Sequence, residues 1–378
     1  MPKFRFTEIA INSTEKKKPV EEDKFTYIGL EHLDSGTLTV SRWGSDIAPI
    51  GEKLVMKKGD VLFGKRRAYQ KKVGIAPFDG IFSAHGMVLR PREEVITKEY
   101  FPLFISSDCF LNEAIRISVG SLSPTVNWKD LKDLEFTIPS IEEQKRITPM
   151  IWAAIETKNA YKEQIKCTDD LVKSQFIEMF GIPESNTKGL PTKPMSDICR
   201  GITDGSHNPP KGIDYSEYLM LSSKNIVDDK ITMDDPRYLS QDQFEIENKR
   251  TQITPGDVLL TIVGTVGRTA IVPENHPKIA LQRSVCVLHP KKEIIDSYFL
   301  FYELKCMQEY IDSIAQGAAQ RGIYLAQVSK LSLVVPDMKE QRLFVEFAEQ
   351  SDKSKFELQQ AIEKVDNLIK SLIQQDNN

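Results

Sequence analysis

Two long stretches of the chain have the apolar spacing of an amphipathic helix, and each follows a segment of shorter patterns. The first runs from Ile138 to Phe180, and Pro149 is its only internal helix breaker. The second opens at Val335 and Pro336. A helix of about forty residues spans roughly 60 Å at about 1.5 Å per residue. The pattern therefore predicts two helices that are longer than one globular domain can cover.

The two stretches are copies of one pattern, and they lie 197 residues apart. Residues 139–144 (Pro-Ser-Ile-Glu-Glu-Gln) correspond to residues 336–341 (Pro-Asp-Met-Lys-Glu-Gln). A Gly-Asp turn before a Val-Leu strand also recurs at this offset, first at 58–60 and then at 255–257. Many matches at one spacing predict an internally duplicated protein.

Apolar residues of the second long stretch fall on the grid of a coiled-coil seam. One set of seam positions is Phe344, Leu358, Val365 and Leu372. The companion set is Phe347, Ala361 and Leu368, and the only interruptions are Ser351 and Ser354. Pairing of the two long helices with each other is favoured over two separate amphipathic helices. The pattern itself leaves parallel and antiparallel pairing open.

Outside the long helices, short strand patterns alternate with glycine- and proline-containing turns. We expect an α+β, internally duplicated fold, with two mixed α/β globular domains separated by the two long helices. The expected order is a first domain over residues 1–138, a central helix over 139–181, a second domain over 182–336 and a C-terminal helix over 337–378.

Composition adds a cellular setting. The five cysteines are scattered and form no C-x-x-C pair, which fits a reducing cytoplasm better than a disulfide framework or a zinc site. No apolar run is long enough to span a membrane, and the polar start of the sequence does not have the pattern of a signal peptide. The net charge of −4 makes no case for nucleic acid by itself, so a DNA-binding protein of this composition must segregate its positive charge locally.

A basic cluster between Lys57 and Lys72 is the strongest binding signal, with Asp60 as its only acidic residue. Lysine and arginine neutralise phosphates, arginine and glutamine form paired hydrogen bonds with base edges, and tyrosine packs on sugar or base. A solvated positive surface is the alternative. The cluster follows a Gly-Asp turn in a segment that differs between the two copies, which favours binding. The candidate DNA-binding residues are Lys65, Arg66, Arg67, Tyr69, Gln70, Lys71 and Lys72.

The second copy offers a loop of short polar residues beside glycine. Its candidates are Thr203, Asp204, Gly205, Ser206 and His207, although an ordinary surface loop has the same composition. Weaker candidates, equally compatible with plain surface, are Lys224, Asn225, Arg268, Arg283 and Arg321.

Catalytic motifs are incomplete. Asn208-Pro209-Pro210 matches the start of the Asn-Pro-Pro-aromatic motif of adenine-N6 methyltransferases, but Lys211 stands where the aromatic residue stacks on a flipped base. The five histidines lack metal-ligand spacing, and the sequence contains no Walker lysine. We expect a chain without catalytic residues, metal ligands or a cofactor of its own.

Together these features resemble the specificity (S) subunits of type I restriction-modification enzymes, over essentially the whole chain. Residues 59–72 and 82–90 are similar to one version of the family's first target-recognition domain, which adds His85 to the candidates. The helix openings at 138–144 and 335–341 are similar to the family's conserved helix starts. The Asp-Gly-Ser-His loop at 204–207 is similar to an Asp-Gly-x-His loop in many such domains.

The resemblance implies two target-recognition domains, each reading one half of a bipartite asymmetric site in double-stranded DNA. The long helices form an antiparallel coiled coil that sets the gap between the half-sites. Two modification subunits carry S-adenosylmethionine and flip the adenine, and two restriction subunits that use ATP and Mg²⁺ can join them. The chain is then a cytoplasmic prokaryotic protein without catalytic activity of its own. The expected subunit-interface residues are Gln144, Ile165, Val172, Gln341, Ile362 and Ile369.

Two other functions are compatible with parts of the pattern. A duplicated coiled-coil scaffold fits if the basic loop binds an acidic protein partner instead of DNA. A self-contained methyltransferase is disfavoured by Lys211 and by the lack of a glycine-rich loop for the methyl donor.

Overall fold

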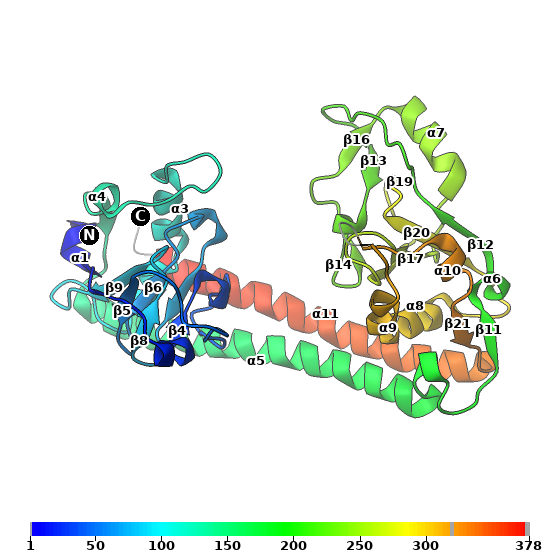
Figure 1. The fold of residues 1–378 in the computed structure, drawn as a ribbon, viewed down its shortest axis with the longest axis horizontal. Coiled ribbons are helices and arrows are strands. Elements are labelled where there is room, and N and C mark those ends of the chain that lie inside the picture. Colours follow the sequence, from blue (N-terminus) through cyan, green and yellow to red (C-terminus); the bar gives the residue numbers. More distant parts are fainter. Residues whose placement is uncertain (1, 318–320, 375–378) are drawn as a thin grey trace. The chain divides into compact units, whose positions relative to one another are not determined.

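The computed structural model describes residues 2–317 and 321–374 of the chain. The chain forms two compact units. Unit 1 comprises residues Met1–Lys162 and Gln359–Asn378, and unit 2 comprises Glu163–Leu358. Each unit therefore contains one globular domain and one segment of each long helix (Figure 1).

The globular domain of unit 1 is built on two four-stranded sheets. One sheet has the order β2 (Ala10–Ser13), β9 (Met87–Pro91), β6 (Val61–Phe63) and β7 (Val73–Ile75). The other has the order β3 (Lys16–Lys17), β5 (Lys53–Met56), β8 (Gly80–Phe82) and β4 (Tyr27–Ile28). The first strand of the domain pairs with the last, as β1 (Lys3–Arg5) with β10 (Glu135–Thr137). The helices are α1 (Phe6–Ile9), α2 (Phe101–Ile105), α3 (Asp108–Arg116) and α4 (Trp128–Leu131).

Aromatic packing holds these helices on the first sheet. Phe110 of α3 lies 5.1 Å from Phe6 and 5.4 Å from Phe63, measured between ring centroids. Phe6, Phe63 and Phe110 have no exposed surface. The hydroxyl of Ser107 accepts the backbone N–H of Phe110, which caps the start of α3. A buried aromatic cluster of this kind fixes the loops that leave the sheet.

Unit 2 repeats this plan with additional elements. Its main sheet has the order β12 (Cys199–Asp204), β20 (Val285–Pro290), β17 (Val258–Thr261) and β18 (Thr269–Ile271). The smaller sheets are β16 (Arg237–Leu239), β13 (Tyr218–Leu221) and β19 (Lys278–Leu281); β14 (Ile226–Val227) and β15 (Lys230–Ile231); and β11 (Thr192–Pro194) and β21 (Ser332–Val334). The helices are α6 (Met195–Ile198), α7 (Gln241–Thr251), α8 (Ser297–Cys306), α9 (Gln308–Ser313) and α10 (Leu325–Val328).

Strand register confirms the duplication. Val61 of β6 pairs with Leu89 of β9, and Val258 of β17 pairs with Leu288 of β20 in the same antiparallel sense. Each sheet places its Gly-Asp turn directly before the central strand, at Gly59 and Gly256, both of which have positive φ. Glycine adopts this conformation without the steric cost of a side chain, which explains why the turn is retained in both copies.

A buried glutamine anchors the start of each long helix. In α5 (Ile141–Phe180), the Gln144 side chain accepts the N–H of Thr97 at 2.7 Å and donates to the carbonyls of Val95 and Pro139, both at 2.9 Å. In α11 (Met338–Gln374), Gln341 makes the corresponding bonds to the N–H of Asp296 and to the carbonyls of Ile294 and Pro336. The repeated helix opening therefore fastens each long helix to its own domain.

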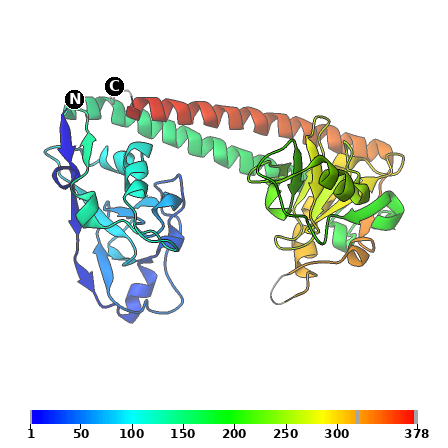
Figure 2. The ribbon, with the colours of Figure 1, turned by 90° about the horizontal axis from the view of Figure 1, so that it is seen from above.

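The two long helices run antiparallel in each unit, as the resemblance implies. In unit 1 the start of α5 shares a core with the end of α11, through Ile147, Ile151, Ile155, Ile369, Leu372 and Ile373. Figure 2 shows the end of α11 beside the start of α5. In unit 2 the end of α5 shares a core with the start of α11, through Val172, Phe176, Phe180, Phe344, Val345 and Ala348.

One predicted seam position on α11, Leu368, was wrong, because it is 50% exposed. The set that begins at Phe344 faces inward, and Phe347 and Ala361 of the companion set are half-buried. Positions one residue later than the companion set are all buried or half-buried: Ala348, Lys355, Ile362 and Ile369. The error arose because Lys355, a charged residue, occupies a seam position and hides the grid.

Candidate nucleic-acid interface

Three loops of the first domain meet beside the basic cluster. The backbone N–H of Arg66 donates to the carbonyl of His85 at 3.2 Å, and the N–H of Arg67 donates to that of Pro124 at 2.6 Å. The N–H of Val126 donates to the carbonyl of Lys65 at 2.9 Å. These bonds join the loops after β6 and β8 to the segment before α4. The predicted residues Lys65, Arg66 and His85 therefore belong to one surface.

The Arg66 and Arg67 side chains are exposed within this surface. Their only described side-chain contacts are long, at 3.4 Å, to Ser123 and His85. Tyr69 is 53% exposed, and Gln70 is half-buried. These two arginines and Tyr69 retain the freedom to bind a ligand.

The backbone of the loop is held in an unusual conformation. Arg67 has φ 56° and Lys71 has φ 49°, both in the left-handed region that non-glycine residues seldom adopt. Such conformations cost of order 1 kcal/mol each and persist where the surroundings impose them. Here the bonds from Arg67 to Pro124 and from Lys71 to Ala68 impose them. The arginine side chains thus project from a rigid turn.

Two predicted DNA-binding lysines are already engaged within the domain. The Lys71 ammonium lies 2.7 Å from Asp108, and the Lys72 ammonium donates to the carbonyl of Leu30 at 2.7 Å. The hydrogen bond from Lys71 is the main reason that the pKa of Asp108 is lowered. Both lysines are half-buried and help to fold the loop. Their assignment as DNA-binding residues stays a prediction.

Several positively charged side chains lie near His85. Burial lowers the pKa of its imidazole, and the charges of Arg66, Lys65 and Lys53 lower it further. Lys53, Lys65 and Arg66 therefore concentrate positive charge beside His85 in a chain whose net charge is −4.

In the second domain, the predicted Asp-Gly-Ser-His loop is organised by a buried carboxylate. Asp204 is 5% exposed, and its two oxygens receive different partners. His207 Nε2 lies 2.8 Å from one oxygen, and the Arg250 guanidinium of α7 donates to the other. His207 and Arg250 are themselves exposed at 53% of their side chains. Asp204 is therefore a positioning residue and does not face a ligand itself.

Close packing explains the glycine of this loop. A Cβ at Gly205 would lie 2.1 Å from the carbonyl oxygen of Leu281. Ser206 bonds to the same strand region, because its N–H donates to Leu281 at 2.8 Å and its carbonyl accepts from Arg283 at 2.9 Å. The exposed Arg283 side chain is thereby brought next to the loop that carries His207.

The remaining predicted residues of the second domain divide into engaged and buried groups. Lys224 pairs with Asp235, Arg321 pairs with Asp312, and Arg268 donates to the carbonyl of Ile226. Asn225 is 1% exposed, and its side-chain amide forms hydrogen bonds with the backbone of Ser222, Thr232 and Asp234. Its assignment to base contact is therefore corrected. The Thr203 hydroxyl is also buried.

Both domains build the surface from equivalent loops. In the first domain, Thr125 bridges to Arg66 and to Val119. In the second, Gly322 bridges to Val263 and to Gln316, each 197 residues later than its counterpart. The two domains therefore share this backbone arrangement, whereas the side chains on it differ.

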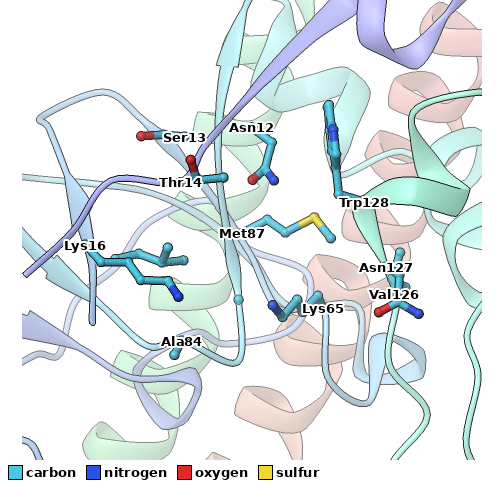
Figure 3. Close-up of a pocket in the computed structure, with 12 residues that line it drawn as sticks. Asn12, Ser13, Thr14, Lys16, Lys65, Ala84, Met87, Val126, Asn127 and Trp128 are labelled. Carbon is cyan, nitrogen blue, oxygen red and sulfur yellow. The ribbon is translucent and has the colours of Figure 1, made fainter. Parts of the chain in front are cut away.

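Sequence reasoning missed several residues of these surfaces. Arg250 carried no signal because it is one of many charged residues on an exposed helix, and Ser123 lies in an unremarked turn. A pocket of about 190 Å³ beside Lys65 was also missed (Figure 3). It is lined by Asn12, Ser13, Thr14, Lys16, Leu54, Lys65, Ala84, Gly86, Met87, Val126, Asn127 and Trp128.

The predicted subunit-interface residues occupy two environments. Gln144 and Gln341 have no exposed surface and bond only within their own domains, so they are corrected to internal anchors of the helices. Val172 is buried, while Ile165, Ile362 and Ile369 are half-buried. Val172 and Ile369 pack in the cores that the two long helices share within each unit.

Two kinds of feature are absent from the described residues. Within residues 2–317 and 321–374, no group of three or more His, Cys, Asp or Glu side chains has an arrangement that holds a metal ion. In the same part of the chain, no helix is long and apolar enough to cross a membrane.

The family described as the type I restriction modification DNA specificity domain matches residues 6–167 and 215–365. The chain therefore belongs to this family, as a type I restriction-modification specificity subunit.

Individual relatives are distant. The chain is 25% identical to the EcoBI specificity subunit of Escherichia coli over 47% of this chain and 37% of that protein. It is 21% identical to an inferred type I restriction enzyme specificity subunit, MjaX, of Methanocaldococcus jannaschii, over 82% and 77% of the two chains. The chain thus spans only about a third of EcoBI but most of MjaX.

A solved structure supports the same fold. It comes from work on complex assembly and conformational transition of the type I R-M system. The TM-score is 0.55 at 20% identity, over 99% of this chain and 97% of that one.

Proposed function

We propose that this chain is the DNA-recognition subunit of a type I restriction-modification enzyme, and that each domain reads one half of a bipartite, asymmetric site. The observation that carries this proposal is the pair of equivalent loop surfaces. The β-bridge between Arg66 and Thr125 in the first domain corresponds to the β-bridge between Val263 and Gly322 in the second. The two domains therefore share one backbone arrangement, but the side chains that it presents differ. Two unlike surfaces suit two unlike half-sites.

In the first domain, Arg66 and Arg67 are the base-reading candidates. They are exposed, they project from a rigid turn, and guanidinium groups form paired hydrogen bonds with guanine in the major groove. In the second domain, His207, Arg250 and Arg283 take this role, with Asp204 orienting the first two. Lys65 and Tyr69 complete the first surface as phosphate and sugar contacts.

The antiparallel helices act as the spacer between half-sites in this proposal. Gln144 and Gln341 fasten each helix to its own domain, and apolar seams join the helices within each unit. Helices fastened in this way transmit a fixed length, so the number of residues in α5 and α11 sets the number of unread base pairs.

Bond-making belongs to partners in this proposal. Lys211 stands where a catalytic aromatic residue is required, so modification subunits supply adenine-N6 methylation and bind S-adenosylmethionine. Two such subunits fit a duplicated chain. Restriction subunits that use ATP and Mg²⁺ join the same assembly, and this chain binds no cofactor.

The test is co-expression with the modification subunit encoded beside it, in cells that lack other adenine methylation, followed by genome-wide mapping of N6-methyladenine. We expect methylation at one bipartite motif with a constant spacer. Cells with the modification subunit alone are the control and should lack the motif. Absence of any motif in the presence of both proteins contradicts the proposal and favours a coiled-coil scaffold for a protein partner.

A further inference from the structure

The pocket beside Lys65 has the chemistry of an anion site. Its polar side chains come from the end of β2, from β3, from the loop after β6 and from the residue before α4 (Figure 3). Met87 lies among them, with Asn12 and Trp128 on one side and the two lysines, Lys16 and Lys65, on the other. Among the described residues that line the pocket, none is an aspartate or a glutamate.

The polar groups of the pocket have unused hydrogen-bonding capacity. Among the described residues, none donates to or accepts from the side chains of Asn12, Ser13, Thr14, Lys65 or Asn127. Lys16 has only a 3.9 Å contact with Glu52. A half-buried ammonium without a counterion is unfavourable, and a second lysine nearby adds repulsion. An anion bound between Lys16 and Lys65 removes both costs.

The arrangement selects a phosphate group. Two ammonium groups supply charge, while hydroxyls and amides supply the directed donors that several oxygens of one anion require. The cavity exceeds the share of a single water molecule, which is about 30 Å³. Met87 and the Trp128 indole add an apolar wall beside the polar end, which fits the sugar carbons next to a phosphodiester.

We propose that this pocket is a phosphate-binding site, and that under the proposed function it receives one backbone phosphate of the DNA. Its position supports that source. Lys65 directly precedes Arg66, and Ala84 and Gly86 flank His85, so the pocket adjoins the candidate interface. A phosphate held here fixes the register of the first domain on the duplex without reading a base.

The lowered pKa of Lys65 agrees with this geometry. Burial lowers the pKa of the ammonium, and the charge of Lys16 lowers it further. A bound phosphate raises this pKa, because its negative charge stabilises the ammonium form.

The experiment uses the full chain in complex with its modification subunit and measures DNA affinity over a series of salt concentrations. Three variants, Lys65→Met, Asn12→Asp and Lys98→Met, each make the net charge more negative by one. Lys98 is an exposed control outside the pocket. Asn12→Asp keeps the side-chain shape and places a carboxylate in the pocket, so it tests the site without opening a cavity.

We expect Lys65→Met and Asn12→Asp to make the negative slope of log affinity against log salt shallower by about 0.9, the value for one lost phosphate contact. Affinity should fall equally for target and non-target duplexes, and the methylated motif should stay the same. Lys98→Met should leave the slope unchanged. If the wild type and the three variants have the same slope, the bound phosphate does not come from DNA, and that part of the proposal is overturned.

A second arm tests free phosphate. Binding of inorganic phosphate to the DNA-free complex is followed by ³¹P NMR at constant ionic strength. Loss of binding in Lys65→Met and Asn12→Asp, with unchanged DNA slopes, supports a phosphate site that takes a free ligand. No change in either arm overturns the site altogether. If the wild-type complex recognises no DNA motif, the proposed function fails, and the phosphate arm still decides the pocket.

Discussion

Lys158 of α5 and Asp366 of α11 form an ion pair at 2.5 Å in the seam of unit 1. Unit 2 contains the same pair with the helices exchanged, because Lys355 of α11 lies 2.7 Å from Asp169 of α5. Lys355 follows Lys158 by 197 residues, and Asp366 follows Asp169 by the same number. Charged residues at seam positions specify register and orientation, so these pairs favour the antiparallel arrangement.

Charge reversal tests the pairs. Lys158→Asp places two carboxylates together and should lower the free energy of unfolding of the chain by about 1–3 kcal/mol, since the pair is only partly shielded from water. The double variant Lys158→Asp with Asp366→Lys should recover most of this loss. Chemical denaturation followed by circular dichroism measures both. A double variant that is no more stable than Lys158→Asp contradicts a role for the pair.

The glutamine anchors predict a large local effect. Gln144→Ala removes three hydrogen bonds and leaves the N–H of Thr97 and two carbonyls without a partner, so the free energy of unfolding should fall by about 2–4 kcal/mol. Gln341→Ala should behave alike in unit 2. Glu142→Ala, at an exposed position of the same helix, is the control and should change little. Guanidinium denaturation compares the three, and similar stabilities would contradict the anchor.

We predict that replacing the exposed arginines of the first domain impairs recognition of only one half-site. Replacing Arg66 and Arg67 with alanine removes base contacts of only one domain, so discrimination at one half of the motif should fall by about tenfold or more. Methylation mapping shows which half relaxes. Lys57→Ala with Lys58→Ala removes two neighbouring exposed cations and should leave both halves intact. Equal relaxation of both halves by the arginine variant contradicts the domain assignment.

We predict that replacing Arg250 impairs recognition of the other half-site. Arg250→Gln removes the guanidinium held by Asp204 and should weaken recognition of the other half-site by about tenfold, equivalent to about 1.4 kcal/mol. Lys249→Gln alters the preceding exposed residue and serves as the control. Binding to duplexes with one altered half-site at a time distinguishes the domains. If Lys249→Gln has the same effect, charge on α7 explains the loss and the Asp204–Arg250 pair does not.

His85 predicts a pH dependence of DNA binding. Its pKa is lowered in the free protein by burial and by the cations around it, so the imidazole is neutral at neutral pH. DNA phosphates offset those cations and raise the pKa, so binding takes up a proton. Affinity should therefore rise as pH falls from about 7.5 to about 5.5, with at most about one proton taken up.

Fluorescence anisotropy across this pH range checks the proton uptake. His85→Gln should flatten the profile, while His276→Gln, in the other unit, should not. A profile that is unchanged by His85→Gln assigns the proton to another group.

The sequence by itself determined the duplication, the two long helices and the location of the basic loop. These features follow from local periodicity and from repetition at one offset, which need no knowledge of distant contacts. The Gly-Asp turns at Gly59 and Gly256 were equally legible, because their backbone conformation favours glycine wherever the chain lies.

Only the tertiary structure decided which charged residues remain available. Lys71 and Lys72 look like Arg66 and Arg67 in the sequence, yet Asp108 and the Leu30 carbonyl engage the lysines and leave the arginines exposed. Lys355 occupies a seam position that the apolar pattern does not reveal, and its partner there is Asp169 of the other helix. In each case the deciding partner lies tens of residues or more away, so its effect cannot be read from local pattern.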